Sequence, residues 1–235
     1  MNSSEDNNLP KGWEEMEYEF SGHTLKITMF KRGNFGVSVF GLVLCRYFED
    51  EMIHFTVKNV LKLGFGTGIV DILVVLLGED VTMTDRPHIL KQIEYNVSAN
   101  IPVSSTHRST IRALAWGDDQ ENFTANYDII LGSDIVYSPT QFRLETLLHL
   151  CKENTIYLSS ELKYRKGSAQ FHDELVPEQF NSKLIHTSKT NCIYKVTKKV
   201  PGDEHKFLMQ RRAYFSHYTI LGFTTLTNIN LYAFL

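Results

Sequence analysis

The sequence predicts an α/β domain built on a doubly wound, mainly parallel sheet of the Rossmann-like kind. Three observations predict it. A turn with glycines at alternate positions, Gly64, Gly66 and Gly68, stands between a β-type run and an apolar helical run. Strand and helix patterns then alternate with short connections as far as Thr197. The polar residues of chemical interest follow the predicted strands, at the edge where such sheets bind ligands.

The elements follow in order from their patterns. Residues 17–29 alternate apolar and polar side chains around Ser21-Gly22-His23, which predicts a β-hairpin, and residues 37–49 have the spacing of an amphipathic helix. Strands of the core sheet are expected at 57–63, 81–84, 111–114, 127–131, 155–158, 184–186 and 192–196. Helices are expected at 67–77, 89–100, 140–151 and 171–180.

Breaker residues support these limits. Gly78 ends the almost wholly apolar helix 67–77, and Pro102 stops the next one. Pro177 is expected to end or kink the helix 171–180. The last two strands are expected to close the sheet as a pair.

The glycine turn predicts a nucleotide-binding loop. Backbone without side chains approaches a ligand closely, and a helix that begins near Thr67 points free N–H groups and a positive dipole end at the loop. The dinucleotide fingerprint places its third glycine where Ile69 stands. Here Gly68 is the third glycine, which gives G-x-G-x-G, the usual form in S-adenosylmethionine (SAM) enzymes.

Asp85 closes the second predicted strand. A carboxylate there accepts both ribose hydroxyls of a nucleoside, an arrangement that serves NAD and SAM alike, so Asp85 predicts a nucleoside site without choosing between them. An N-cap before Pro87 is the other interpretation, and it is compatible with the first. Ile69 and the lack of a Tyr-x-x-x-Lys pair disfavour an NAD-linked reductase.

Further candidates follow the third and fourth strands. Trp116 is either a core aromatic residue or a surface that packs against an adenine. The backbone N–H of Ser133 is placed to meet the same base. Asp134 and Tyr137 form a D-x-x-Y run, in which Asp134 lies too early to cap the helix after Pro139.

Composition sets the broad class. The 235 residues suit one large domain, and a formal net charge of −3 gives no sign of a surface made for nucleic acid or for a membrane. Three cysteines far apart in apolar contexts predict reduced core residues of an intracellular protein. They are Cys45, Cys151 and Cys192.

Three regions are expected. Residues 1–16 are polar, lack the apolar run of a signal peptide and are expected to be disordered. Residues 17–199 are expected to form the domain. Residues 200–235, rich in aromatic residues and threonine, do not continue the strand–helix pattern and are expected to be an atypical C-terminal appendage.

Several motifs together resemble one family. LGFGTGIV, VTMTD, LAWG and YDIILGSDIVY resemble the seven-strand protein-lysine methyltransferases of the methyltransferase-like 21 group. The D-x-x-Y run is the narrower of these signals, and the likeness covers about residues 17–197. It implies a seven-strand class I methyltransferase sheet with an N-terminal hairpin. It also implies SAM-dependent transfer of methyl groups to a lysine of a protein.

The resemblance also implies roles for residues. Cofactor contacts are implied for Gly64, Phe65, Gly66, Thr67, Gly68, Asp85, Trp116 and Ser133. Asp134 would orient the incoming amine and Tyr137 would wall its channel, with no metal. The likeness extends to the members that modify elongation factor 1-alpha, so it implies as substrate this factor or a chaperone-type protein, with no nucleic acid and no membrane. We expect a monomer in the cytoplasm and also in the nucleus.

Two departures from the family pattern stand beside the likeness. The family usually opens its glycine motif with E-L-G, and this chain has Lys62-Leu63-Gly64. The family also carries a Trp before the first helix, where segment 36–45 has none and Phe40 is the nearest aromatic residue. Lys62 is expected to repel the positive groups of SAM. The alternative function is therefore a catalytically weakened relative that serves as a SAM- or partner-binding module.

Overall fold

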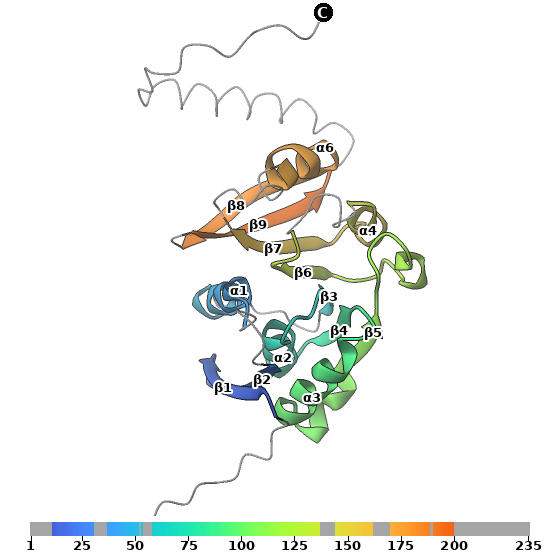
Figure 1. The fold of residues 1–235 in the computed structure, drawn as a ribbon. Coiled ribbons are helices and arrows are strands. Elements are labelled where there is room, and N and C mark those ends of the chain that lie inside the picture. Colours follow the sequence, from blue (N-terminus) through green and yellow to red (C-terminus); the bar gives the residue numbers. More distant parts are fainter. Residues whose placement is uncertain are drawn as a thin grey trace, which may run out of the picture. The chain divides into compact units, whose positions relative to one another are not determined.

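The structure is a computed structural model that describes residues 11–30, 37–51, 53, 58–136, 144–161, 170–188 and 190–199. Within them, a seven-stranded sheet has the order β5-β4-β3-β6-β7-β9-β8 (Figure 1). Its strands are β3 (Asn59–Leu63), β4 (Asp80–Asp85), β5 (Ser109–Ala113), β6 (Ile129–Ser133), β7 (Thr155–Glu161), β8 (Phe180–Ser188) and β9 (Asn191–Lys198). β3 to β7 pair in parallel, whereas β9 runs antiparallel to β7 and to β8. The predicted doubly wound sheet is confirmed.

Helices connect the strands, and a separate hairpin precedes them. The hairpin pairs β1 (Trp13–Phe20) with β2 (His23–Phe30) as a two-stranded antiparallel sheet. The helices are α1 (Val39–Asp50), α2 (Ile69–Leu76), α3 (Leu90–Asn100), α4 (Leu144–Leu150) and α6 (Val176–Gln179). Shorter helical turns are η1 (Val103–Arg108), η2 (Gln120–Asn122) and the π-helical η3 (Phe171–Leu175). The expected N-terminal hairpin is therefore present.

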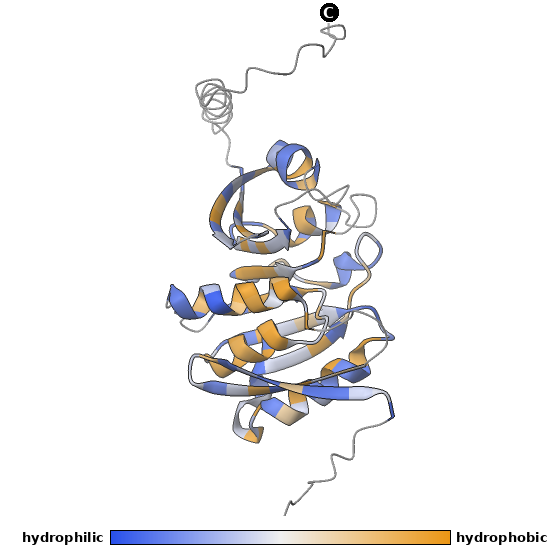
Figure 2. Cartoon of the chain, turned by 60° about the vertical axis from the view of Figure 1, so that its left-hand side comes forward, coloured by the Kyte–Doolittle hydropathy of each residue, from blue (hydrophilic) through white to orange (hydrophobic). Residues whose placement is uncertain are grey.

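The core has one cluster of apolar side chains on each face of the sheet. On one face, residues of α1, α2, α3 and β2 pack with Val60 of β3. On the other, residues of α4, η3 and α6 pack with Leu61 and Leu63 of the same strand. Figure 2 shows the apolar residues that run along α1 and α2. Alternate residues of β3 thus face opposite clusters, as the pleat of a strand requires.

Several element limits differ from those predicted. β1 begins at Trp13, so residues 13–16 belong to the hairpin and not to the disordered start, because they pair with β2 as far as Phe30. β7 extends to Glu161 and β8 begins at Phe180. Both strands are longer than predicted because antiparallel pairing with β9 keeps polar residues extended that have no strand pattern of their own. Pro177 stands in the first turn of α6, where a missing N–H costs nothing.

Other limits differ as well. The polar segment expected as a loop contains η1. The helix expected at 140–151 is described as α4 from Leu144. Residues 1–10 and 200–235 lie outside the described residues, and the last described strand, β9, ends at Lys198.

Side-chain amides of α3 dock the hairpin onto the domain. Asn96 accepts a hydrogen bond from the Thr28 N–H (3.0 Å) and donates one to the Thr28 carbonyl (3.0 Å). Asn100 makes the same pair of bonds with the backbone of Lys26, at 2.7 and 2.8 Å. Asn96 is fully buried and also donates to the carbonyl of Thr67 in the glycine turn (2.8 Å). One buried amide therefore joins the hairpin to that turn.

We predict that Asn96→Ala destabilises the domain far more than its matched control, Asn100→Ala. The first change removes the partner of the Thr28 N–H and of the Thr67 carbonyl and leaves the Thr28 carbonyl with only a longer bond from Gln92 (3.4 Å), which costs roughly 2–4 kcal/mol. The two bonds of Asn100 to Lys26 lie at the surface, where water replaces them for under about 1 kcal/mol. Urea unfolding of both variants measures the difference, and equal losses would show that the third bond of Asn96 contributes nothing.

Candidate active site

A pocket opens at the carboxyl ends of the parallel strands, where the strand order reverses. From β3 the chain moves outward through β4 to β5 and then returns to β6 on the other side of β3. Such a switch point leaves a crevice between the turns that follow β3 and β6. The pocket here has a volume of about 1220 Å³. That volume exceeds the roughly 300–1,000 Å³ of a typical small-molecule site.

Most of the predicted site residues meet in this pocket. It is lined by Gly64, Phe65, Gly66, Thr67, Asp85, Trp116, Ser133 and Asp134. Gly68 lies just behind the lining, as the residue that precedes α2. Tyr137 lies outside the described residues, so its predicted role stays a prediction.

The glycine turn has the backbone that only glycine adopts freely. Gly64, Gly66 and Gly68 have φ angles of 65°, 58° and 85°. A Cβ on Gly68 would stand 1.8 Å from the ring of Phe65, which fills the space beneath the turn. A Cβ on Gly66 would meet nothing within 4 Å, because that glycine faces the pocket. The bare backbone at Gly66 fits close approach by a ligand.

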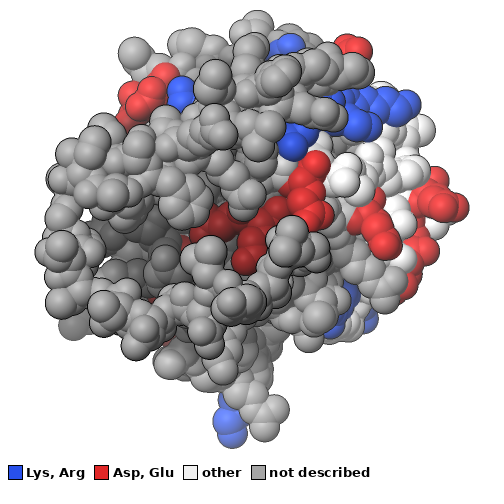
Figure 3. Space-filling view, turned by 90° about the horizontal axis from the view of Figure 1, so that it is seen from above, with Lys and Arg blue, Asp and Glu red and all other residues white. Residues whose placement is uncertain are grey.

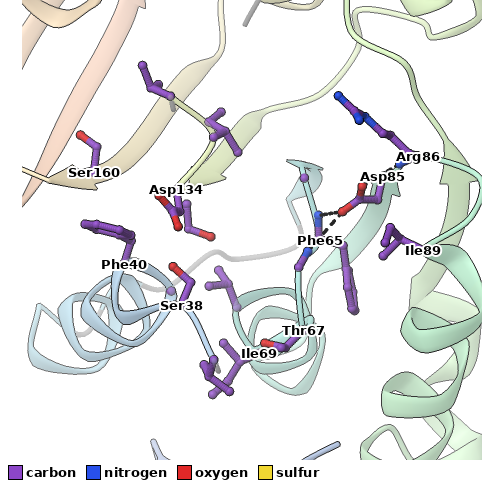
Figure 4. A pocket seen from close by; sticks show the side chains of 18 of the residues that line it. Ser38, Phe40, Phe65, Thr67, Ile69, Asp85, Arg86, Ile89, Asp134 and Ser160 are labelled. Carbon is purple, nitrogen blue, oxygen red and sulfur yellow. Dashed lines mark hydrogen bonds between the residues drawn. The ribbon is translucent and has the colours of Figure 1, made fainter. Parts of the chain in front are cut away.

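Asp85 holds the turn from its amide side. Its Oδ2 accepts hydrogen bonds from the N–H groups of Phe65 (3.0 Å) and Gly66 (3.3 Å), and its Oδ1 accepts one from Arg86 (2.7 Å). Figure 4 shows the two bonds to the turn. The carboxylate therefore shapes the turn as well as lining the pocket, a second role that its position at the end of β4 did not predict.

Trp116 combines the two positions that the sequence left open, because it packs against one core cluster and also lines the pocket. The indole stands over the turn, with its Cζ2 3.3 Å from where a Cβ of Gly64 would lie, and it is partly exposed to the pocket. It is thus a wall of the pocket and not a fully buried core residue. With the bare turn and the Asp85 carboxylate, this ring forms a surface that fits an adenosyl group.

Asp134 has a strained backbone at the pocket. Its φ of 57° lies in the left-handed region, which non-glycine residues seldom adopt and which recurs at functional sites. Its N–H donates to the carbonyl of Ser159 (3.0 Å), which fixes the turn after β6. The side chain is exposed and reaches the pocket. This geometry aims a carboxylate away from the cofactor turn and toward the rest of the pocket (Figure 4).

The other end of the pocket contains residues that sequence reasoning passed over. Ser38, Phe40 and Ser160 lie near Asp134 in Figure 4, opposite Phe65 and Asp85. Phe40, the nearest aromatic residue to the missing Trp, therefore does line the pocket. Ser160 and Glu161 were missed because β7 was expected to end at Leu158. Residues 162–169, which follow β7, lie outside the described residues.

A buried histidine holds Ser160. The Ser160 Oγ lies 2.8 Å from the Nε2 of His172, whose ring stacks on Tyr194 with centroids 4.0 Å apart. Burial lowers the pKa of His172 to about 4, so the ring is neutral at neutral pH. The hydroxyl of Ser160 is thus fixed at the pocket wall by an uncharged neighbour.

Lys62 does not face the pocket, contrary to expectation. Its side chain is completely buried on the other side of the turn, and it is not among the residues that line the pocket. Its amine donates to the carbonyl oxygens of Leu63 (3.1 Å) and Gly64. The expected direct repulsion of SAM is therefore corrected, because the amine is buried and bound to backbone carbonyls and does not line the pocket.

Exposed acidic side chains lie together in two short helical elements. Exposed acids of η3 and α6 are Asp173, Glu174 and Glu178. Figure 3, seen from above, shows acidic side chains gathered on that face.

No group of three His, Cys, Asp or Glu residues that could hold a metal occurs in the part of the chain that the structure describes. Nor is any helix of that part long and apolar enough to cross a membrane.

Similar solved structures share the fold. The chain superposes with a TM-score of 0.56 on the Thermus thermophilus 16S rRNA N2 G1207 methyltransferase RsmC, solved with AdoMet and guanosine, at 17% identity, over 81% of this chain and 52% of that one. The glycopeptide N-methyltransferase MtfA, solved with S-adenosyl-L-homocysteine, gives a TM-score of 0.51 at 13% identity, over 68% and 87%. These neighbours show the class I methyltransferase fold.

Sequence relatives are much closer. EEF1A lysine methyltransferase 3 of Xenopus tropicalis is 45% identical over 194 residues, which cover 79% of this chain and 86% of the relative. The Mus musculus protein of that name is 41% identical over 83% and 88%, and the Xenopus tropicalis protein N-lysine methyltransferase METTL21A is 42% identical over 65% and 71%. Residues 20–177 match the lysine methyltransferase family as a whole. The chain belongs to the lysine methyltransferase family.

Proposed function

We propose that this lysine methyltransferase uses SAM to methylate a lysine of elongation factor 1-alpha. The observation that carries the choice of substrate is the identity of 41–45% to two EEF1A lysine methyltransferases, over most of both chains. The cofactor is supported by the glycine turn, Asp85 and Trp116 around one pocket, and by fold neighbours solved with AdoMet or its product.

Methyl transfer needs one end of the pocket to hold the cofactor and the other to orient the amine. Methyl transfer is an in-line displacement in which a neutral amine attacks the methyl carbon of a sulfonium. A free lysine has a pKa near 10.4, so the site must hold the amine unprotonated and aligned at the moment of attack. We propose that the turn, Asp85, Trp116 and Ser133 hold the cofactor, and that Asp134 orients the amine as an acceptor. Tyr137 is proposed as a wall of the amine channel.

We also propose action as a monomer in the cytoplasm and nucleus. All three cysteines are free and buried, which suits a reducing compartment. Size-exclusion chromatography and cell fractionation check the two parts separately.

Incubation of the purified chain with elongation factor 1-alpha and methyl-deuterated SAM tests the substrate. We predict labelled methyl groups on one lysine, identified by peptide mass spectrometry, and none on a chaperone offered in parallel. Labelling of the chaperone alone would reassign the substrate. Tight SAM binding with no labelling of either protein, or of cell lysate, would favour the alternative function, a module that binds SAM or a partner.

We predict that Asp85→Ala lowers SAM affinity at least about tenfold in a folded protein, since hydrogen bonds to a charged group contribute roughly 1.5–3 kcal/mol each. The carboxylate also holds two amides of the turn, so both effects act in the same direction. Asp80→Ala, at the opposite end of β4, is the matched control and retains affinity. Calorimetric titration decides, and equal affinities for the Asp85 variant and the parent would remove Asp85 from the site.

We predict that Asp134→Gly keeps SAM affinity but lowers the methyl-transfer rate about 100-fold or more, through misplacement of the amine. Glycine is the suitable replacement because it adopts the φ of 57° without strain. Calorimetry and single-turnover labelling of the protein substrate measure the two effects. Methylation at the parent rate would make Asp134 a structural residue of the turn after β6.

A further inference from the structure

A charged side chain stands in the apolar layer beneath the cofactor turn. The pleat of β3 turns Lys62 to the same face as Val60, whose side chain belongs to the cluster formed with α1 and α2. Lys62 has no exposed surface. A lysine is almost never fully buried unless something compensates its charge or its polar atoms. Two features of its surroundings supply that compensation.

The first feature is the contact with the turn. The amine of Lys62 donates to the carbonyl oxygens of Leu63 (3.1 Å) and Gly64, which are the last residue of β3 and the first of the turn. Asp85 meanwhile accepts from the N–H groups of Phe65 and Gly66. The turn is thereby held on its carbonyl side by Lys62 and on its amide side by Asp85.

The second feature is a carboxylate in the same layer. Asp71 stands in the first turn of α2, has no exposed surface, and has no hydrogen-bond partner for either carboxylate oxygen among the described residues. Burial raises the pKa of Asp71 to about 7, and the nearby charge of Lys62 opposes that rise. Burial likewise lowers the pKa of Lys62, and Asp71 is the foremost of the groups that oppose it. Each group therefore favours the charged form of the other.

Other acidic groups act on Lys62 more weakly. Asp85, Cys45 and Asp134 also favour its charged form, after Asp71. Asp85 and Asp134 line the pocket, whereas the thiol of Cys45 is buried and has its own pKa raised by that burial. Asp71 is thus the buried carboxylate that shares the layer beneath the turn with Lys62.

We propose that Lys62 is a positioning residue of the cofactor turn and that Asp71 is the buried counter-charge that allows it to stand there. The proposal rests on the proposed cofactor site. It replaces the repulsion expected between Lys62 and SAM with a supporting contact, and it predicts that Asp71 matters to a site it does not touch.

A double-mutant cycle tests the pairing. Lys62→Met and Asp71→Ala each leave one buried ionisable group without the group that stabilises its charged form, so each lowers the thermal midpoint Tm by roughly 6–20 °C. Lys62→Met/Asp71→Ala removes both charges, and its Tm exceeds that of the less stable single variant. Should a single variant fail to fold while the double variant folds, that result shows the same coupling. Losses of Tm that simply add would overturn the pairing.

Calorimetric titration with SAM tests the positioning role on the same proteins. We expect Lys62→Met and the double variant both to bind SAM at least about tenfold more weakly, although the double variant regains stability. Val60→Ala, on the same face of β3, lowers Tm by a cavity and leaves affinity within about threefold. Unchanged or tighter binding by the double variant would overturn the positioning role. A flat titration of the unaltered protein would instead overturn the cofactor site itself, while the Tm cycle still reports on the pair.

Discussion

The site depends on the two-sided support of one short turn. Three residues in the left-handed region cannot hold their shape by regular hydrogen bonding, because the turn from Gly64 to Gly68 belongs to neither β3 nor α2. Asp85 accepts hydrogen bonds from two amides of the turn, Lys62 donates to its first carbonyl, and Asn96 donates to the carbonyl of Thr67. Each support comes from a different element. The shape of the cofactor turn is thus a property of the whole domain.

The topology explains why these supports meet. β3 is the middle one of the five parallel strands and pairs with β4 on one side and β6 on the other, so the ends of β4 and β6 flank its turn. Asp85 ends β4 on one side, and Asp134 follows β6 on the other. The proposed cofactor end and the proposed acceptor end of the pocket are consequently built by opposite halves of the sheet. Antiparallel pairing of β7 with β9 then lengthens β7, which carries Ser160 and Glu161 to the acceptor end.

Much of this was readable from the sequence, for physical reasons. Alternate glycines between a strand and a helix favour a tight turn, and a carboxylate at the end of a parallel strand lies at the edge where the pocket opens, so the positions of the turn and of Asp85 at the pocket were predicted correctly. Ser160 was missed because the polar end of β7 has no strand pattern of its own and depends on its partner β9. Asn96 was missed because an amide in a helix is normally solvated, and only the docked hairpin gives it backbone partners.

Lys62 shows where a residue-by-residue comparison with a family is insufficient. A lysine where relatives carry an acid suggested repulsion of the cofactor, yet strand alternation alone already placed it with Val60, under α2. The orientation was therefore in the sequence, whereas the compensating carboxylate of Asp71 became visible only when α2 was packed on β3. A departure from a family motif has to be judged together with the residues that face it.

The central claim is that this turn binds SAM and that Lys62 supports it without opposing the cofactor's charge. The most direct measurement is calorimetric titration of the unaltered chain with SAM and with S-adenosylhomocysteine, which lacks the methyl group and the positive charge on sulfur. The account predicts one site per chain and affinities for SAM and its product within about tenfold of each other. Absence of binding, or SAM bound far more weakly than its uncharged product, would contradict it.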